Sequence, residues 1–276
     1  MRVRTGGAPG DRSRDLRVAP QAGRATGGGD LVRGTIERAN AEERAALVCY
    51  LPAGYPDLDV SETCLRAAAA AGADVLEVGF PFSDPVIDGP IIQAANQAAL
   101  EQGISVDDDL ALCARLTASV DVPTLLMTYY TIPAARGLDT FAADAAAVGL
   151  AGAILPDLPA EEAGDWLDRA AAHGLSTVFL AAPTSSEARL DAIAAVSSGF
   201  VYATSVLGVT GVRDSLADAR QLVERIRERT DLPVAVGIGV SSPEQAQEVA
   251  TYADGVIVGS ALVRAVGDGD PTSAHR

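Results

Sequence analysis

Short apolar runs alternate with longer alanine-rich segments along most of the chain. Eight runs rich in Val, Ile, Leu and Ala are predicted to be strands, namely Ala46–Leu51, Asp74–Gly79, Val122–Thr128, Ala151–Leu155, Ser176–Ala181, Gly199–Thr204, Pro233–Ile238 and Gly255–Gly259. The segments between them are predicted to be helices, at about 59–71, 90–118 in two pieces, 138–148, 160–173, 186–196, 214–230 and 243–252. Strand and helix in regular alternation predict a parallel sheet, and eight such units are the number that closes a barrel.

Local signals at the ends of these segments support the same scheme. Ser242-Pro243-Glu244-Gln245 has the form of a capping box with proline at the first helical position, so a helix should begin after the seventh strand. The segment 34–44 predicts an extra helix before the first strand. A doubly wound open sheet is the alternative architecture, but the first strand is followed by Leu51-Pro52-Ala53-Gly54-Tyr55-Pro56 rather than G-x-G-x-x-G. The prediction is therefore an α/β fold, a single (β/α)8 TIM barrel with an extra N-terminal helix.

The two ends of the chain lack this alternation. Residues 1–29 are rich in Gly, Arg and Pro without any hydrophobic period, which predicts a disordered N-terminal tail. An arginine-rich leader is also compatible with a transit peptide, but Asp11, Asp15 and the lack of an apolar stretch favour a tail or an early start codon. The catalytic barrel is predicted over 30–267, followed by a flexible C-terminal tail over 268–276.

Composition limits the possible partners and compartments. With 37 acidic and 21 basic residues the net charge is −16, which repels a phosphate backbone and argues against nucleic acid as a partner. No run approaches the ~18 consecutive apolar residues of a membrane helix. Cys49, Cys64 and Cys113 are odd in number and isolated, so they are expected in the core of a protein of the reducing cytoplasm.

The basic residues also limit the chemistry. All 21 are arginines, so Schiff-base aldolase chemistry and covalently bound pyridoxal phosphate, which both need a lysine amine, are excluded. His173 and His275 are the only histidines, and a multi-histidine metal site is therefore not expected.

A glutamate lies inside the second predicted strand, between Leu76 and Val78. Burying the Glu77 carboxylate in apolar surroundings is costly and should raise its pKa toward values useful for acid–base catalysis. The alternative is a structural glutamate that forms a salt bridge with an arginine. In a closed barrel the active site lies at the carboxyl ends of the strands, so a functional Glu77 would point there.

The loop after this strand carries Asp84 and Asp88 and is stiffened by prolines at 81, 85 and 90. The prolines leave the two carboxylates little conformational entropy to lose. Two or three carboxylates above a barrel are able to bind Mg²⁺, or to accept a hydrogen bond from a ligand and shuttle protons. Turn-forming aspartates are also common, and the residues alone leave these roles open.

Glycine-rich loops follow the last three predicted strands. They are Gly208-Val209-Thr210-Gly211, Gly237-Ile238-Gly239 and Gly259-Ser260-Ala261. Barrels often bind phosphate at this place through main-chain N–H groups and a helix N-terminus, and glycine lets the anion approach closely. Each loop alone is weak evidence because glycine also ends strands for steric reasons. Together they predict a phosphate site.

One long motif resembles a known family. The run A-D-V-L-E-V-G-F-P-F-S-D-P-V-I-D-G-P-I-I-Q over 73–93 resembles the signature of tryptophan synthase α subunits. Shorter stretches similar to that family are Ala53–Pro56, Leu126–Tyr130, Pro156–Pro159, Gly208–Gly211 and Gly237–Ser241. The resemblance spans about residues 33 to 266, in the family's order and spacing.

The resemblance implies a carbon–carbon lyase that cleaves indole-3-glycerol phosphate into indole and glyceraldehyde 3-phosphate, without a metal or cofactor. It implies that Glu77 is the general acid–base that protonates indole C3, and that Asp88 binds the indole N1–H. Asp84 is implied to contact the partner subunit or to order its loop. The same resemblance implies a cytoplasmic enzyme of tryptophan biosynthesis that passes indole to a β subunit in an α2β2 heterotetramer.

The binding residues follow from the same resemblance. Those implied to hold the substrate phosphate are Gly211, Gly239, Gly259 and Ser260. Those implied to line the indole pocket are Tyr50, Tyr129, Tyr202 and Ile238, with ordinary core packing as the alternative. Thr210 is implied to contact the loop of Asp88 on closure. The chain departs from the family after Ala265, where the usual long last helix is lacking, so the eighth helix is expected to be short and the barrel less well closed.

Two other functions compete with this interpretation. One is a stand-alone lyase or another phosphosugar barrel enzyme, such as an isomerase or epimerase. Epimerases of that type present a set of metal-binding histidines, which two histidines cannot supply. The other is a catalytically silent scaffold that keeps only the loops that activate a partner.

Overall fold

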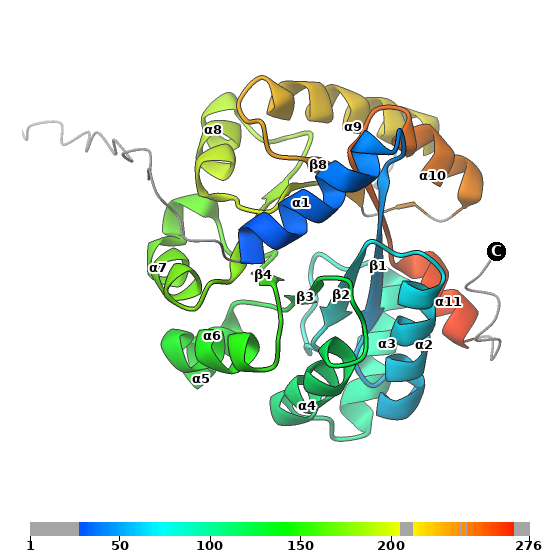
Figure 1. Cartoon of the computed structure of the whole chain (residues 1–276), viewed down its shortest axis with the longest axis vertical. Coiled ribbons are helices and arrows are strands. Elements are labelled where there is room, and N and C mark those ends of the chain that lie inside the picture. The colour runs from blue at the N-terminus through cyan, green and yellow to red at the C-terminus, as the bar shows by residue number, and fades with distance from the viewer. Residues whose placement is uncertain (1–27, 205–211, 238, 241, 268–276) are drawn as a thin grey trace, which may run out of the picture.

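The strands of the computed structural model, which describes residues 28–204, 212–237, 239–240 and 242–267, form one parallel sheet. They are β1 (Ala46–Pro52), β2 (Val75–Gly79), β3 (Thr124–Met127), β4 (Gly152–Ile154), β5 (Ser176–Val178), β6 (Leu180–Ala181), β7 (Val201–Thr204), β8 (Val234–Gly237) and β9 (Gly255–Val258). Their order is β5-β4-β3-β2-β1-β9-β8-β7-β6. Because β5 and β6 are consecutive parts of one segment interrupted at Phe179, the two ends of the sheet meet and the barrel closes (Figure 1). The predicted TIM barrel is confirmed, with the fifth predicted strand divided in two.

Helices follow the strands and surround the barrel (Figure 1). They are α1 (Gly28–Ala41), α2 (Leu58–Ala70), α3 (Pro90–Glu101), α4 (Val106–Thr117), α5 (Thr131–Arg136), α6 (Leu138–Ala147), the 3₁₀ helix η1 (Ala160–Glu162), α7 (Gly164–Ala172), α8 (Glu187–Val196), α9 (Val212–Arg227), α10 (Pro243–Ala250) and α11 (Ser260–Gly267). The predicted helices correspond to these elements, but α5 was not predicted and the helix expected at 160–173 begins with a 3₁₀ turn.

Side-chain caps fix where several helices begin. The Ser242 hydroxyl accepts a hydrogen bond from the Gln245 N–H, with Pro243 at the first position of α10, as the sequence predicts. A reciprocal capping box at the start of α4 pairs Ser105 with Asp108. These caps satisfy N–H groups that a helix start otherwise leaves unpaired.

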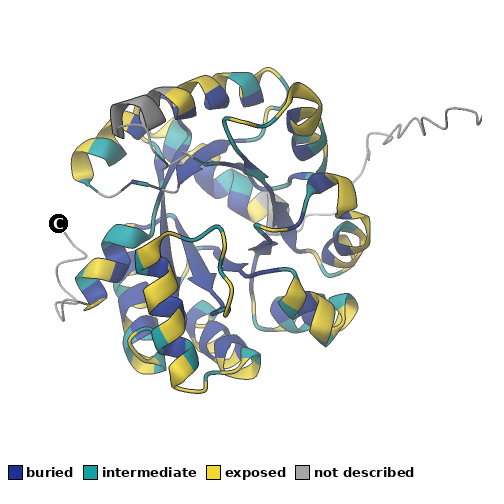
Figure 2. Ribbon diagram, turned by 180° about the vertical axis from the view of Figure 1, so that it is seen from behind, coloured by how far each residue is buried: buried dark blue, intermediate teal, exposed yellow. Residues whose placement is uncertain are grey.

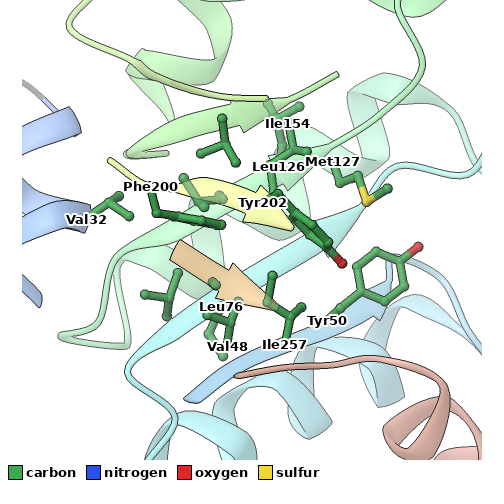
Figure 3. Packing of buried hydrophobic residues seen from close by; sticks show 14 of the residues in the cluster. Val32, Val48, Tyr50, Leu76, Leu126, Met127, Ile154, Phe200, Tyr202 and Ile257 are labelled. Atoms are coloured by element: carbon green, nitrogen blue, oxygen red, sulfur yellow. The ribbon is translucent and has the colours of Figure 1, made fainter. Parts of the chain in front are cut away.

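Helix α1 crosses the amino-terminal end of the barrel (Figure 1). Val32 and Ile36 on this helix are completely buried, and Figure 3 shows Val32 beside Phe200 at the start of the barrel interior. The helix extends further toward the N-terminus than the predicted 34–44 and ends at Ala41, just before Glu43, whose φ of 60° is not helical. Its first described residue, Gly28, lies inside the segment predicted as a tail; the rest of that prediction, 1–27, and the tail at 268–276 lie outside the described residues.

Apolar side chains fill the barrel and the layer between barrel and helices, while the outer faces of the helices are exposed (Figure 2). Residues from different strands of the sheet, including Val48, Met127 and Ile154, meet inside the barrel (Figure 3). The three cysteines are free and buried, as expected. Among the described residues, no helix is both long and apolar enough to cross a membrane.

The last strand and helix complete the barrel. Helix α11 is described over Ser260–Gly267, up to the last described residue, so the expectation of a short last helix stays a prediction. Strand β9 nevertheless pairs in parallel with β1 on one side and with β8 on the other. The last strand thus has its backbone pairings on both sides, and these pairings do not depend on the length of the last helix.

Candidate active site

Strand β2 places Glu77 inside the barrel, where its register partners are Tyr50 on β1 and Leu125 on β3. The residue is completely buried, and neither carboxylate oxygen has a hydrogen-bonding partner among the described residues. Burial first, and the charge of Asp88 second, raise the pKa of Glu77 to about 8. This carboxyl is therefore mostly protonated at neutral pH, and among the described residues it forms no salt bridge with an arginine.

Asp88 lies on the loop between β2 and α3 and faces the same cavity as Glu77. Burial raises its pKa to about 6, while hydrogen bonds from the Tyr129 hydroxyl and the Asn96 amide act in the opposite direction. The Asn96 Nδ2 lies 3.2 Å from the Asp88 Oδ2. At neutral pH one carboxyl of the cavity is thus protonated and the other ionised, which separates a proton donor from a hydrogen-bond acceptor.

The cavity between these carboxyls has a volume of about 90 Å³ and opens at the carboxyl ends of the strands. Its lining consists of Tyr50, Glu77, Ile87, Asp88, Gly89, Ile92, Met127, Tyr202, Gly239, Val240, Ile257, Gly259 and Ser260. Seven of the predicted site residues are among them: Glu77, Asp88, Tyr50, Tyr202, Gly239, Gly259 and Ser260. The other lining residues are mainly apolar, which suits an aromatic ring with few polar groups.

Two buried tyrosines line the cavity, and both are packed against a glycine in the same way. Each ring leans over a glycine on the neighbouring strand, two residues beyond its own register partner: Tyr50 over Gly79, and Tyr202 over Gly237. A Cβ atom at either glycine would collide with the tyrosine hydroxyl, so only glycine leaves room. Figure 3 shows both rings on the side of the barrel interior away from Val32. Burial raises the pKa of both phenols far above the usual value, so both remain neutral.

Main-chain groups border the cavity on the side of β8 and β9. Gly259 lies between β9 and α11, and Ser260 is the first residue of α11, so the unpaired N–H groups of this helix start lie beside the cavity. Gly239, with φ of 115°, has the left-handed backbone that favours glycine. This arrangement suits an anion that approaches main-chain donors. Of the remaining predicted residues, Thr210, Gly211 and Ile238 lie outside the described residues.

Tyr129 does not belong to the lining of the cavity. Its ring stacks on Phe82, with centroids 4.9 Å apart and planes at 17°, and its hydroxyl accepts a hydrogen bond from the Ile87 N–H at 3.1 Å. The residue predicted to line an indole pocket therefore lies behind the loop of Asp88. Asp84 is exposed on the same loop and accepts a hydrogen bond from the Ser83 hydroxyl.

Asn96 is a functional candidate that the sequence prediction missed. It is buried on α3, with its amide directed at Asp88. The signal was available, because Ile92, Ala95, Asn96 and Ala99 form one apolar helical face in which asparagine is the only polar member. A buried polar side chain on such a face usually has a specific partner.

Comparison with known proteins identifies the family. A model of the tryptophan synthase alpha chain family matches residues 36–275. The chain belongs to the tryptophan synthase alpha chain family. The tryptophan synthase alpha chain of Leifsonia xyli subsp. xyli is 50% identical over 246 residues, which cover 89% of this chain and 94% of that protein. That of Streptomyces avermitilis is 48% identical over 247 residues, which cover 89% of each protein.

Solved structures of the family share the barrel. A chain of Mycobacterium tuberculosis tryptophan synthase superposes with a TM-score of 0.83 at 43% identity, covering 88% of this chain and 93% of that chain. Tryptophan synthase subunit alpha from Legionella pneumophila gives a TM-score of 0.81 at 34% identity, covering 91% of this chain and 95% of that chain. Membership of the family therefore rests on both sequence and fold.

Proposed function

We propose that this protein is the α subunit of tryptophan synthase and cleaves indole-3-glycerol phosphate into indole and glyceraldehyde 3-phosphate, with Glu77 and Asp88 as its catalytic residues. Family membership supplies the reaction class. The observation that carries the assignment of roles is the pair of carboxyls with opposite protonation in one cavity, one protonated near neutral pH and the other ionised.

In the first step the proton of Glu77 moves to indole C3, which converts the ring into an electron sink. The ionised Asp88 accepts the hydrogen bond of the indole N1–H and stabilises the positive charge that develops there. The bond between C3 and the side chain then breaks, and its electron pair returns to the ring to give indole. The side-chain hydroxyl loses its proton to the Glu77 carboxylate as the aldehyde forms, so the acid is restored without any added reactant.

The phosphate of the substrate is assigned to main-chain donors at Gly239, Gly259 and Ser260, which border the same cavity. Thr210, Gly211 and Ile238 complete this proposal by resemblance alone. Tyr50 and Tyr202 would flank the indole ring. We assign the β subunit as the partner that takes up indole, in an α2β2 heterotetramer, and place the enzyme in the cytoplasm, in keeping with three free buried cysteines.

Turnover of indole-3-glycerol phosphate tests the proposal directly. The purified chain, alone and with a β subunit, should release indole and glyceraldehyde 3-phosphate in equal amounts. Glu77→Gln should lower kcat by about 10²–10⁴-fold, the usual contribution of a general acid–base, while the circular dichroism spectrum stays unchanged. Absence of indole release, or normal turnover of Glu77→Gln, would refute the assignment.

A further inference from the structure

Ile87 is the one described residue that lines both the cavity of Glu77 and Asp88, the catalytic cavity, and a larger space beside it. The larger space, the neighbouring pocket, has a volume of about 440 Å³ and lies over the carboxyl ends of β4 and β6, with Pro156 and Leu180 in its apolar inner wall. The Ile87 main chain is held by the hydrogen bond from its N–H to the Tyr129 hydroxyl at 3.1 Å, whereas its half-buried side chain is apolar and forms no hydrogen bond.

The two spaces divide the mouth of the barrel between them. Met127 of β3 lines the catalytic cavity, whereas Pro156 after β4, the next strand of the sheet, lines the neighbouring pocket. On the other side of the mouth, Tyr202 of β7 lines the catalytic cavity, and its register partner Leu180 of β6 lines the neighbouring pocket. Ile87, on the loop after β2, therefore lies where the two spaces meet.

The catalytic cavity alone is too small for the proposed substrate. Its volume is about 90 Å³, whereas an engineered protein cavity that binds one benzene molecule has about 150 Å³. Indole consists of two fused rings, and the substrate carries a glycerol phosphate arm in addition. The bound substrate must therefore extend beyond the catalytic cavity.

The groups assigned to the substrate indicate the direction in which it extends. The main-chain donors assigned to its phosphate, at Gly239, Gly259 and Ser260, lie on the side of β8 and β9. In the closed barrel β4 lies across from β9, so the neighbouring pocket is on the far side of the mouth from these donors. A substrate that is anchored by its phosphate and has its reacting carbon at Glu77 thus points the six-membered ring of its indole toward the neighbouring pocket.

We propose that Ile87 is a specificity-determining residue: its side chain separates the two spaces and is displaced when the substrate binds, so that the six-membered ring lies beside it and reaches into the neighbouring pocket. The inference deepens the proposed function and rests on it for the identity of the substrate. The isoleucine side chain can change between staggered rotamers without any movement of the hydrogen-bonded main chain. The size of the side chain at this position then decides which substituents on the six-membered ring the enzyme accepts.

The first test compares two substrates. Ile87→Ala should raise the kcat/KM for indole-3-glycerol phosphate methylated at C6, the ring position farthest from the side chain, by about tenfold relative to the kcat/KM for the unsubstituted substrate. This ratio cancels any loss that affects both substrates alike, such as a less ordered Asp88. Val86→Ala is the matched control, because Val86 is 79% exposed and lines neither space, so its ratio should equal that of the wild type. An unchanged ratio in Ile87→Ala would overturn the inference.

The second test varies the size of the side chain in both directions. Ile87→Phe should raise the KM of the unsubstituted substrate and lower the ratio below that of the wild type, because the larger ring leaves less room between the two spaces. Ile87→Val removes one methyl group and should give a ratio between those of Ile87→Ala and the wild type, in a protein with an unchanged circular dichroism spectrum. A ratio that does not follow side-chain size in this order would contradict the proposed separation of the two spaces.

Binding without turnover separates this inference from the proposed reaction. The probes are 3-(indol-3-yl)propyl phosphate and its 6-methyl form, which lack the side-chain hydroxyl that becomes the aldehyde and so cannot be cleaved. Calorimetry should show that Ile87→Ala favours the 6-methyl form relative to the wild type and that Val86→Ala does not. An unchanged preference overturns the inference even where the enzyme is active. A changed preference in a protein that releases no indole sustains the role of Ile87 and refutes only the reaction, and a wild type that binds neither probe refutes both.

Discussion

The two ends of the barrel treat their carboxylates in opposite ways. At the amino-terminal end, Asp74 accepts two hydrogen bonds from Arg44, at 2.7 and 2.9 Å, and a third from the Leu47 N–H at 2.8 Å. Asp254 at the same end accepts from the Val234 N–H and from Arg227, both at 2.8 Å. Three residues beyond Asp74, at the other end, Glu77 has no partner among the described residues.

Asp74 and Asp254 stabilise the fold through their hydrogen bonds, whereas the unpaired Glu77 is available for proton transfer. Buried polar groups in native proteins are normally hydrogen-bonded, and an unpaired one costs stability. Asp74 and Asp254 at the amino-terminal end follow that rule. The cost at Glu77 is the kind that active sites carry, because a fully paired glutamate would have neither a free proton nor room for a substrate.

The largest expected effect is the pH-dependent cost of Glu77. Its native pKa of about 8 lies above the ordinary value of 4.5, so the native state binds the proton more tightly, and stability falls as pH rises from 4.5 to 8. Relative to Glu77→Gln, which does not titrate, the wild type should lose about 3–5 kcal/mol of unfolding free energy between pH 5 and 8.5. Urea denaturation of both proteins at several pH values measures this; parallel pH dependences would contradict it.

The next largest effect is a loss of stability at the amino-terminal end of the barrel. Asp74→Ala leaves the Leu47 N–H and Arg44 without their acceptor and should lower the free energy of unfolding by about 2–3 kcal/mol, with kcat unchanged. Asp74→Asn keeps one acceptor oxygen and should lose less. Urea denaturation and indole release, measured on the same preparations, check the two halves of this expectation. A loss of kcat in the folded Asp74→Ala protein would show that the two ends are not independent.

The smallest effect uses two glycines. Gly237→Ala places a methyl group against the Tyr202 hydroxyl and should cost about 1–2 kcal/mol of stability while raising KM, since the ring shifts into the cavity. Gly34→Ala on α1 is the matched control, because nothing lies within 4 Å of its added methyl group. It should stabilise the protein by about 0.5–1 kcal/mol without changing KM. Thermal melts measure the stability of both variants, and steady-state kinetics measure their KM. Equal KM values for Gly237→Ala and the wild type would show that the shape of the cavity does not depend on Tyr202.

Elements with strong periodicity were predictable from the sequence. The eight strands, Glu77 within the second of them and the cap at Ser242 all follow from local patterns, and the structure contains each. The break at Phe179 could not be predicted from the sequence. The residues before it pair with β4 and those after it pair with β7, and this change of partner arises only when the barrel closes. Helix α5 has six residues with a proline at its third position, too short to leave a periodic signal.

Within the site, the sequence indicates which residues lie near the cavity better than it indicates which other residues they contact. The sequence singles out Glu77, Asp88, Gly239 and Gly259 because strand ends and loops reveal their place, and the structure puts them around one cavity. Their roles stay predictions. The sequence does not reveal that the Tyr129 ring stacks on Phe82 and its hydroxyl binds the Ile87 N–H, because the neighbours of a side chain at the end of a strand decide its direction. Its place in the indole pocket stays a prediction. Asn96 was missed because its role depends on a residue eight positions away across a loop.

The paired tyrosines and glycines carry a consequence for engineering the enzyme. Because Tyr50 overlies Gly79 and Tyr202 overlies Gly237 with the same offset, each large residue and its small neighbour occupy one shared volume. Libraries that vary these positions one at a time will mostly return inactive clones. Libraries that exchange both members of a pair together, shrinking one while enlarging the other, should reshape the cavity for bulkier or differently substituted rings without breaking the barrel.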